Sequence, residues 1–181
     1  MSLESSALVF DAYGTLFDVH SVAQLAESLF PGKGASLSQA WRTKQLEYTW
    51  LKSLMGRYED FNSVTAASLE WAIAAQRIVA GEGAKQALMD EYRRLAMFPE
   101  VPAALAKLAA ARPLAILSNG HPDMLNAVVA HNGLAERFRG GVLSIHAAKS
   151  YKPAPAVYRL AEESLGVPRT MMLFVLSLIH I

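Results

Sequence analysis

The chain has 181 residues, of which 52% are hydrophobic, 17 basic and 16 acidic, for a formal charge of +1. This length suits one domain, or one domain with an inserted lobe, and the apolar residues suffice for a sizeable core. The sequence has no basic stripe, no cysteine and no apolar run near the roughly 20 residues that span a bilayer, which argues against nucleic-acid binding, a disulfide framework and a membrane-spanning helix.

The first predicted element is a buried strand that ends at a carboxylate. The apolar run Leu8-Val9-Phe10 is followed directly by Asp11, with Gly14 and Thr15 in the turn behind it. In an open parallel sheet, ligands bind beyond the carboxyl ends of the strands, so Asp11 is well placed to act as a nucleophile. The alternative is an aspartate that only caps a helix or forms an Asx-turn.

A long helical segment follows, from about residue 19 to residue 97. Its apolar side chains are spaced to form one stripe on a helix, at Leu37, Trp41, Tyr48, Leu51 and Met55. Further helices are predicted at 63–79 and 84–96, with glycine-containing breaks at 32–34 and 81–83.

From residue 98 onward, helices and strands alternate. The predicted helices are 101–111, 124–131 and 154–165, and the predicted strands are 114–117, 141–144 and 171–175. Strands separated by helices indicate a parallel sheet with right-handed crossovers. We therefore predict an α/β core of residues 1–18 and 98–181, and a helical cap domain of residues 19–97 inserted after the first strand, over the active edge of the sheet.

Two later segments carry polar groups at the ends of predicted strands. Ser118 and Asn119 follow the second strand and have donors for an anion, while Gly120 lets backbone amides approach it. Two lysines, Lys149 and Lys152, follow the third strand, where a cation beside Asp11 would offset the repulsion of an anionic substrate. The alternatives are a helix-capping Ser118 or Asn119 and a solvated loop lysine.

The pattern Asp11-x-x-x-Thr15 after a first strand resembles the opening motif of the haloacid dehalogenase superfamily, whose aspartate forms a covalent intermediate. Members that act on phosphates carry a second aspartate two positions on, which helps to hold magnesium. That position is Tyr13 here, and it lacks the anionic oxygen that a hard cation prefers. The sequence Asp-Ala-Tyr-Gly-Thr-Leu is typical of the L-2-haloacid dehalogenase branch. The resemblance therefore implies a Rossmann-like core with a helical cap, and an enzyme that uses neither metal nor cofactor.

The same resemblance implies roles for the candidate residues. Ser118 matches a family serine or threonine, Asn119 the residue that helps to bind departing halide, Lys152 the family lysine, and Tyr158 a tyrosine near the site. In the cap, residues 41–42 and 44–51 resemble the dehalogenase cap helix. Its arginine, Arg42, would attract the anionic substrate and stabilise leaving halide, unless it is an ordinary surface arginine. The apolar part of the pocket would be lined by Tyr13, Leu46 and Phe61, or these are plain core residues.

The implied activity is that of a (S)-2-haloacid dehalogenase-type hydrolase, which converts L-2-haloalkanoic acids to D-2-hydroxy acids. Asp11 displaces halide from C2 with inversion and leaves an aspartyl ester, which water then hydrolyses. Thr15, Ser118 and backbone amides would hold the carboxylates, while Arg42 and Asn119 receive the halide.

The resemblance covers about residues 7–175. The family continues with Ser-Ser-Asn-x-Trp-Asp, whose asparagine and aspartate anchor the lysine and position water, whereas this chain reads Leu-Ser-Leu-Ile-His-Ile from residue 176. We therefore expect a truncated or frameshifted end, with ester hydrolysis impaired more than alkylation.

Two other functions stay open at this point. One is a magnesium-dependent phosphatase or phosphonate hydrolase of the same superfamily, and the other is a catalytically dead, truncated remnant that keeps the fold. A histidine-based metal site is not expected, since the five histidines show no close ligand pairing. The expected partner is a small 2-haloacid, without nucleic acid or membrane. The resemblance predicts a homodimer, and the absence of cysteine and of a signal peptide favours the cytoplasm.

Overall fold

The computed structural model describes residues 6–177, so the last part of the divergent end, residues 178–181, lies outside the described residues. Its sheet comprises β1 (Ala7–Phe10), β2 (Leu114–Ser118), β3 (Val142–Ser144) and β4 (Met172–Val175), in the order β3-β2-β1-β4. Every neighbouring pair in this order is parallel. The predicted α/β core with a parallel sheet is therefore confirmed.

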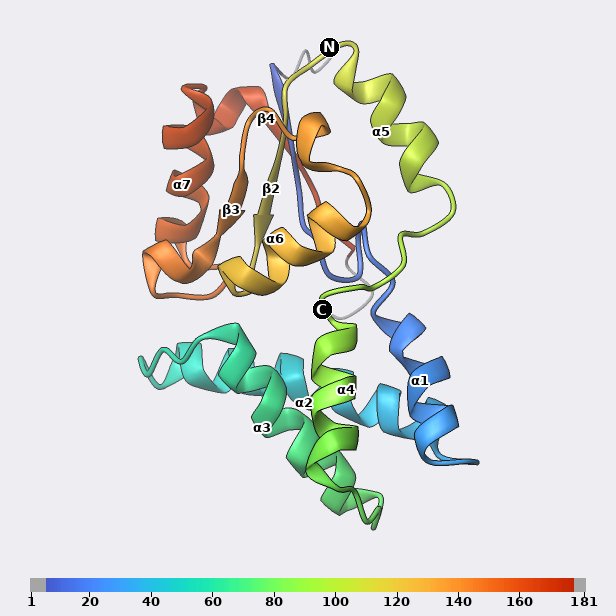
Figure 1. The fold of residues 1–181 in the computed structure, drawn as a ribbon. Coiled ribbons are helices and arrows are strands. Elements are labelled where there is room, and N and C mark those ends of the chain that lie inside the picture. Colours follow the sequence, from blue (N-terminus) through green and yellow to red (C-terminus); the bar gives the residue numbers. More distant parts are fainter. Residues whose placement is uncertain (1–5, 178–181) are drawn as a thin grey trace.

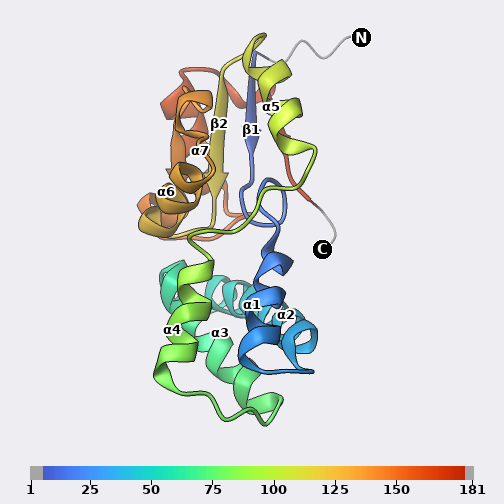
Figure 2. The same cartoon turned by 45° about the vertical axis from the view of Figure 1, so that its right-hand side comes forward.

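Helices cover both faces of this sheet. In Figure 2, α6 (Pro122–His131) and α7 (Pro155–Leu165) lie on one face, and α5 (Val101–Ala109) lies on the other. This explains why β1 and β2 are apolar at successive positions and buried along their whole length, instead of alternating with polar residues.

The remaining helices form a separate bundle beyond the carboxyl ends of the strands, at the bottom of Figure 1. They are α1 (Val22–Leu29), α2 (Gly34–Leu54), α3 (Phe61–Ala75) and α4 (Glu82–Glu91). The chain enters and leaves the bundle side by side, since Phe17 bridges to Met97 and the Asp18 amide donates to the Ala96 carbonyl at 2.8 Å. None of the helices within residues 6–177 has both the length and the apolar character that crossing a bilayer requires.

The apolar stripe predicted on α2 is buried only in its first half. Trp41 is buried, but Leu51 is 41% and Met55 is 55% exposed. The second half of α2 instead turns Gln45 and Thr49 into the bundle. Burial was therefore predicted wrongly at the two apolar positions, because buried hydrogen bonds, described below, decide which side of the helix faces inward.

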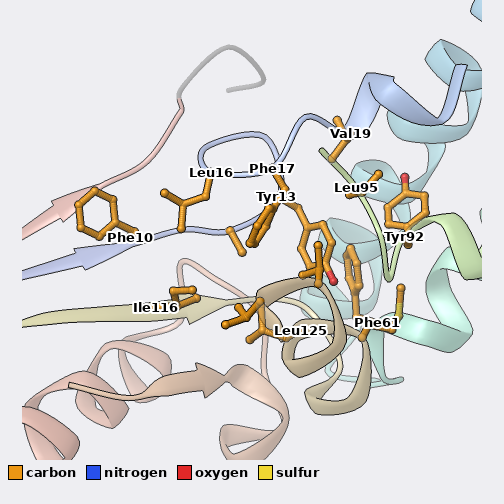
Figure 3. Close-up of a cluster of buried hydrophobic side chains, with 14 of the residues drawn as sticks. Phe10, Tyr13, Leu16, Phe17, Val19, Phe61, Tyr92, Leu95, Ile116 and Leu125 are labelled. Carbon is orange, nitrogen blue, oxygen red and sulfur yellow. The ribbon is translucent and has the colours of Figure 1, made fainter. Parts of the chain in front are cut away.

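A continuous cluster of buried side chains connects the sheet to the bundle (Figure 3). Tyr13 lies in its middle, with ring centroids 5.5 Å from Phe61, 6.0 Å from Tyr92 and 6.5 Å from Phe17. The loop that follows β1 is therefore packed from both sides, which holds the residues at the end of β1 in place.

Candidate active site

Asp11 is the first residue after β1, and its carboxylate is held on one side. Its Oδ1 accepts a hydrogen bond from the Ala12 amide at 2.8 Å and lies 2.6 Å from Nζ of Lys152. Within the described residues Oδ2 has no hydrogen-bond partner, and the Asp11 side chain is 14% exposed. One carboxylate oxygen is thus fixed, and the other is free to react.

Lys152 is positioned by the end of β2. Its Nζ also donates to the Leu117 carbonyl at 3.1 Å, and its amide donates to Oδ1 of Asn119 at 3.2 Å. The other candidate lysine, Lys149, lies elsewhere, with Nζ 2.6 Å from Nε2 of His146. The structure therefore places Lys152, and not Lys149, beside Asp11, as the family resemblance implied.

Arg42 comes to the same place from helix α2 of the bundle. Its NH2 donates to the Tyr13 carbonyl at 3.3 Å and its NH1 to Oε1 of Gln45 at 2.7 Å, while Nε has no partner among the described residues. Burial lowers the pKa of Arg42, although a guanidinium stays charged at neutral pH. Gly14 lies beside this contact with φ +89°, a backbone conformation that favours glycine, whereas a Cβ there would lie at an ordinary contact distance of 3.6 Å from NH2.

These groups meet at a cavity of about 240 Å³ between the sheet edge and the bundle. It is lined by Asp11, Tyr13, Gly14, Arg42, Leu46, Trp50, Asn119, Lys152, Pro153, Tyr158, Leu176 and Ser177. A larger cavity of about 430 Å³ lies between α7 and β4 and shares only Pro153 and Tyr158 with it. Because the smaller cavity holds the carboxylate, the lysine and the guanidinium together, we take it as the candidate active site.

Three predicted site residues do not line this cavity. Oγ1 of Thr15 accepts a hydrogen bond from the Ser177 amide at 2.9 Å. Ser118 is fully buried, and its Oγ accepts from the Gly120 amide at 3.1 Å. Phe61 packs behind the Tyr13 ring, at 5.5 Å between centroids. Thr15 and Phe61 thus contact residues that line the cavity, whereas Ser118 contacts Gly120, which does not line it.

Trp50 and Ser177 line the cavity without having been predicted there. Trp50 could have been found from spacing, because Arg42, Leu46 and Trp50 lie four residues apart and so share one face of a helix. Ser177 follows the last predicted strand. It contributes its backbone amide, which donates to Thr15, and the identity of a side chain does not predict such a contact.

Both tyrosines of the cavity are neutral at ordinary pH. Burial raises the pKa of Tyr13, and burial together with the negative charge of Asp11 raises the pKa of Tyr158. Tyr13 therefore supplies no anionic ligand at the position where a metal-binding aspartate would stand. Among residues 6–177, no three histidine, aspartate or glutamate side chains gather as a potential metal site.

Comparison with known proteins gives a consistent set of relatives. Residues 6–175 match the family model of haloacid dehalogenase-like hydrolases. The (S)-2-haloacid dehalogenase of Xanthobacter autotrophicus is 47% identical over 171 residues, which are 94% of this chain and 67% of that enzyme. The (S)-2-haloacid dehalogenase of Pseudomonas sp. strain YL is 46% identical over 171 residues, which are 94% of this chain and 73% of the relative.

Solved structures agree with the sequence comparison. The L-2-haloacid dehalogenase of Xanthobacter autotrophicus superposes with a TM-score of 0.88 at 47% identity, covering 93% of this chain and 68% of that chain. The structure of the same enzyme with chloropropionic acid covalently bound matches equally well. The present chain thus spans about two thirds to three quarters of the length of these relatives.

Proposed function

Because this chain belongs to the family of haloacid dehalogenase-like hydrolases, we propose that it hydrolyses L-2-haloalkanoic acids to D-2-hydroxy acids through an ester on Asp11. The observation that carries the proposal is the cavity in which Asp11, Lys152 and Arg42 meet. It provides a nucleophile with one free oxygen, and two cations for an anionic substrate and an anionic leaving group.

In the first step, Oδ2 of Asp11 attacks C2 of the haloacid. The new C–O bond forms as the carbon–halogen bond breaks, and halide leaves with the electron pair. Lys152 and the Ala12 amide hold Oδ1, so the carboxylate presents its other oxygen in one fixed direction. Such orientation matters because the attacking oxygen must lie opposite the leaving halogen.

Arg42 and Asn119 are suited to receive the departing halide. Oδ1 of Asn119 is occupied by the Lys152 amide, and within the described residues its Nδ2 has no partner, which leaves this donor for an anion. Leu46 and Trp50 contribute apolar wall beside the guanidinium. Arg42 is itself 7% exposed, so its attraction for the halide is weakened little by water.

In the second step, water attacks the ester carbonyl of Asp11. The water oxygen bonds to Cγ, the ester bond at that carbon breaks, and the D-2-hydroxy acid leaves with the original Asp11 oxygen. One water proton goes to that departing oxygen, and the other goes to solvent as the Asp11 carboxylate forms again. Thr15 and Ser118 are proposed to hold the carboxylate groups together with backbone amides. The Thr15 hydroxyl accepts from the Ser177 amide and the Ser118 hydroxyl from the Gly120 amide, so each hydroxyl keeps its own proton to donate to a carboxylate.

The two alternative functions are less favoured. A magnesium-dependent phosphatase needs an anionic ligand where Tyr13 stands, and the neutral hydroxyl of that residue is buried. A catalytically dead remnant is not favoured by the close relatives, which are named as dehalogenases.

The arrangement of helices supports further proposals about organisation. We propose that residues 19–97 act as a cap and that residues 1–18 and 98–181 form the core, joined through the Phe17–Met97 bridge. For a homodimer, the supporting feature is a set of exposed apolar side chains on α2, on the residue that follows it and on α3: Trp50, Leu51, Leu54, Met55 and Trp71. The cytoplasmic location stays a prediction.

The proposed function is tested by following halide release from L-2-chloropropionate without added metal. We expect release by the unaltered chain and none by Asp11→Asn, with D-lactate as the organic product. Asp123→Asn is the matched control, because Asp123 lies on α6 with its side chain 75% exposed. Release of phosphate from phosphate esters only after addition of magnesium would contradict the proposal.

A further inference from the structure

Behind Arg42, on the side away from the cavity, lies a buried chain of polar groups. NH1 of Arg42 donates to Oε1 of Gln45 at 2.7 Å, and Nε2 of Gln45 donates to Oγ1 of Thr65 at 2.8 Å. The Thr65 hydroxyl in turn donates to the Phe61 carbonyl at 2.6 Å. Gln45 and Thr65 are both 0% exposed, so these hydrogen bonds do not compete with water.

The chemistry of its neighbours determines the orientation of the Gln45 amide. The guanidinium of Arg42 can only donate, so it must face the amide oxygen. The hydroxyl of Thr65 gives its proton to a carbonyl, so it accepts from the amide nitrogen. The position thus requires one acceptor and one donor on a side chain of this length, which is what glutamine provides.

The whole chain of hydrogen bonds contains no negative charge. Within residues 6–177 the Arg42 guanidinium forms no ion pair with a carboxylate, although the charge of Asp11 acts on it from a distance. The nearby hydroxyls of Tyr13 and Tyr92 stay neutral, because burial raises the pKa of each. A buried guanidinium without a counter-ion attracts an external anion more strongly than a paired one.

We propose that Gln45 is a positioning residue that holds the Arg42 guanidinium against the Tyr13 carbonyl while leaving its charge unmatched for the anion that enters the cavity. Thr65 on α3 fixes Gln45, so the helix pair α2 and α3 sets the place of the guanidinium. The inference rests on the proposed function, since it assigns Gln45 a part in binding the haloacid and its halide.

The substitution Gln45→Glu separates this role from a merely structural one. The carboxylate keeps an acceptor for Arg42 and makes that contact stronger, and the Thr65 hydroxyl can turn its proton from the Phe61 carbonyl to the new carboxylate, so a residue that only supports the fold would tolerate the change. Under our proposal the new charge cancels that of Arg42. We then expect the KM for L-2-chloropropionate and the inhibition constant for bromide to rise about 10- to 100-fold, the range of one charge-assisted hydrogen bond.

Two further variants complete the set. Gln45→Met has a similar shape but neither donor nor acceptor, so we expect it to lower kcat through a misplaced guanidinium while changing the inhibition constant for bromide less than Gln45→Glu does. Gln39→Glu is the matched control on the same helix, because Gln39 is exposed and its side chain donates to Oγ1 of Thr43 at 3.4 Å, away from Arg42. It is expected to leave KM and bromide inhibition unchanged.

A double variant tests whether Gln45 acts through Arg42. The rate of ester formation on Asp11, followed by intact mass, should be the same in Arg42→Ala and in Arg42→Ala/Gln45→Met, since no guanidinium is left for Gln45 to position. Bromide affinity of Gln45→Glu equal to that of the unaltered chain would overturn the inference. If the unaltered chain releases no halide, the proposed function fails, while the rise in unfolding temperature with bromide still reports anion binding to each variant.

Discussion

Nζ of Lys152 lies 2.6 Å from Oδ1 of Asp11 and also donates to the Leu117 carbonyl of the neighbouring strand at 3.1 Å. The lysine is therefore held by the sheet itself, and the carboxylate is held by the lysine. With both side chains largely buried, at 9% and 14% exposure, the pair has little access to water that could replace either partner.

Removing this cation should impair the attack on the haloacid. Lys152→Met keeps the length of the side chain but leaves Asp11 without its partner, so we expect kcat/KM to fall about 100-fold or more. Lys149→Met is the control, because Lys149 contacts His146 and not Asp11. Steady-state halide release checks both variants, and equal losses in the two would contradict the assignment of Lys152.

Arginine should be required at position 42 for its shape as well as its charge. Arg42→Lys keeps a cation but cannot donate to Gln45 and the Tyr13 carbonyl in the same fork geometry. We expect kcat/KM to fall about tenfold or more, the loss of one hydrogen bond to a charged group. The same change at the exposed Arg57 should have no effect on halide release.

Gly120 should be needed for the packing of Tyr13. A Cβ at Gly120 would lie 2.6 Å from Cε2 of Tyr13, which is closer than such atoms approach. Gly120→Ala should lower the free energy of unfolding by about 1–3 kcal/mol, as overpacking does elsewhere. Gly83→Ala, in open space within α4, should instead raise it by up to about 1 kcal/mol. Urea unfolding measures both, and a neutral Gly120→Ala would show that the Tyr13 ring can move.

Alkaline pH should loosen the contact between the bundle and the core. Burial and the nearby Asp60 charge raise the pKa of Tyr58 from 10.0 to about 12, and its hydroxyl lies 3.0 Å from Nδ1 of His146. Above pH 10 the unfolded chain loses this proton first, so stability is complete below pH 10 and falls as pH rises towards 12. Urea unfolding across this range should show a smaller fall for Tyr58→Phe than for the unaltered chain or Tyr48→Phe.

The sequence was sufficient to predict the sheet and one side of the site. Each strand is an apolar run, and polar residues follow β1 and β2 directly, so Asp11 and Asn119 had to meet at one edge. The choice between Lys149 and Lys152 needed the family resemblance, because both follow β3 and the sequence alone does not show which of them lies beside Asp11.

The cap was less predictable than the sheet. Periodicity placed Leu51 and Met55 on the buried face of α2, whereas Gln45 and Thr49 occupy it. The reason is that Gln45 is fixed by Arg42 and by Thr65, which is twenty positions further along the chain. A pattern along one helix contains no information about a partner on another.

The most direct test of the account is the fate of oxygen during turnover. The chain is incubated with L-2-chloropropionate in water enriched in oxygen-18, and the proteolytic peptide that contains Asp11 is analysed by mass spectrometry. An ester on Asp11 predicts heavy oxygen in its carboxylate, and the label should be absent without substrate. Labelled lactate together with an unlabelled Asp11, after many turnovers, would mean that water attacks the haloacid directly and would contradict the central claim.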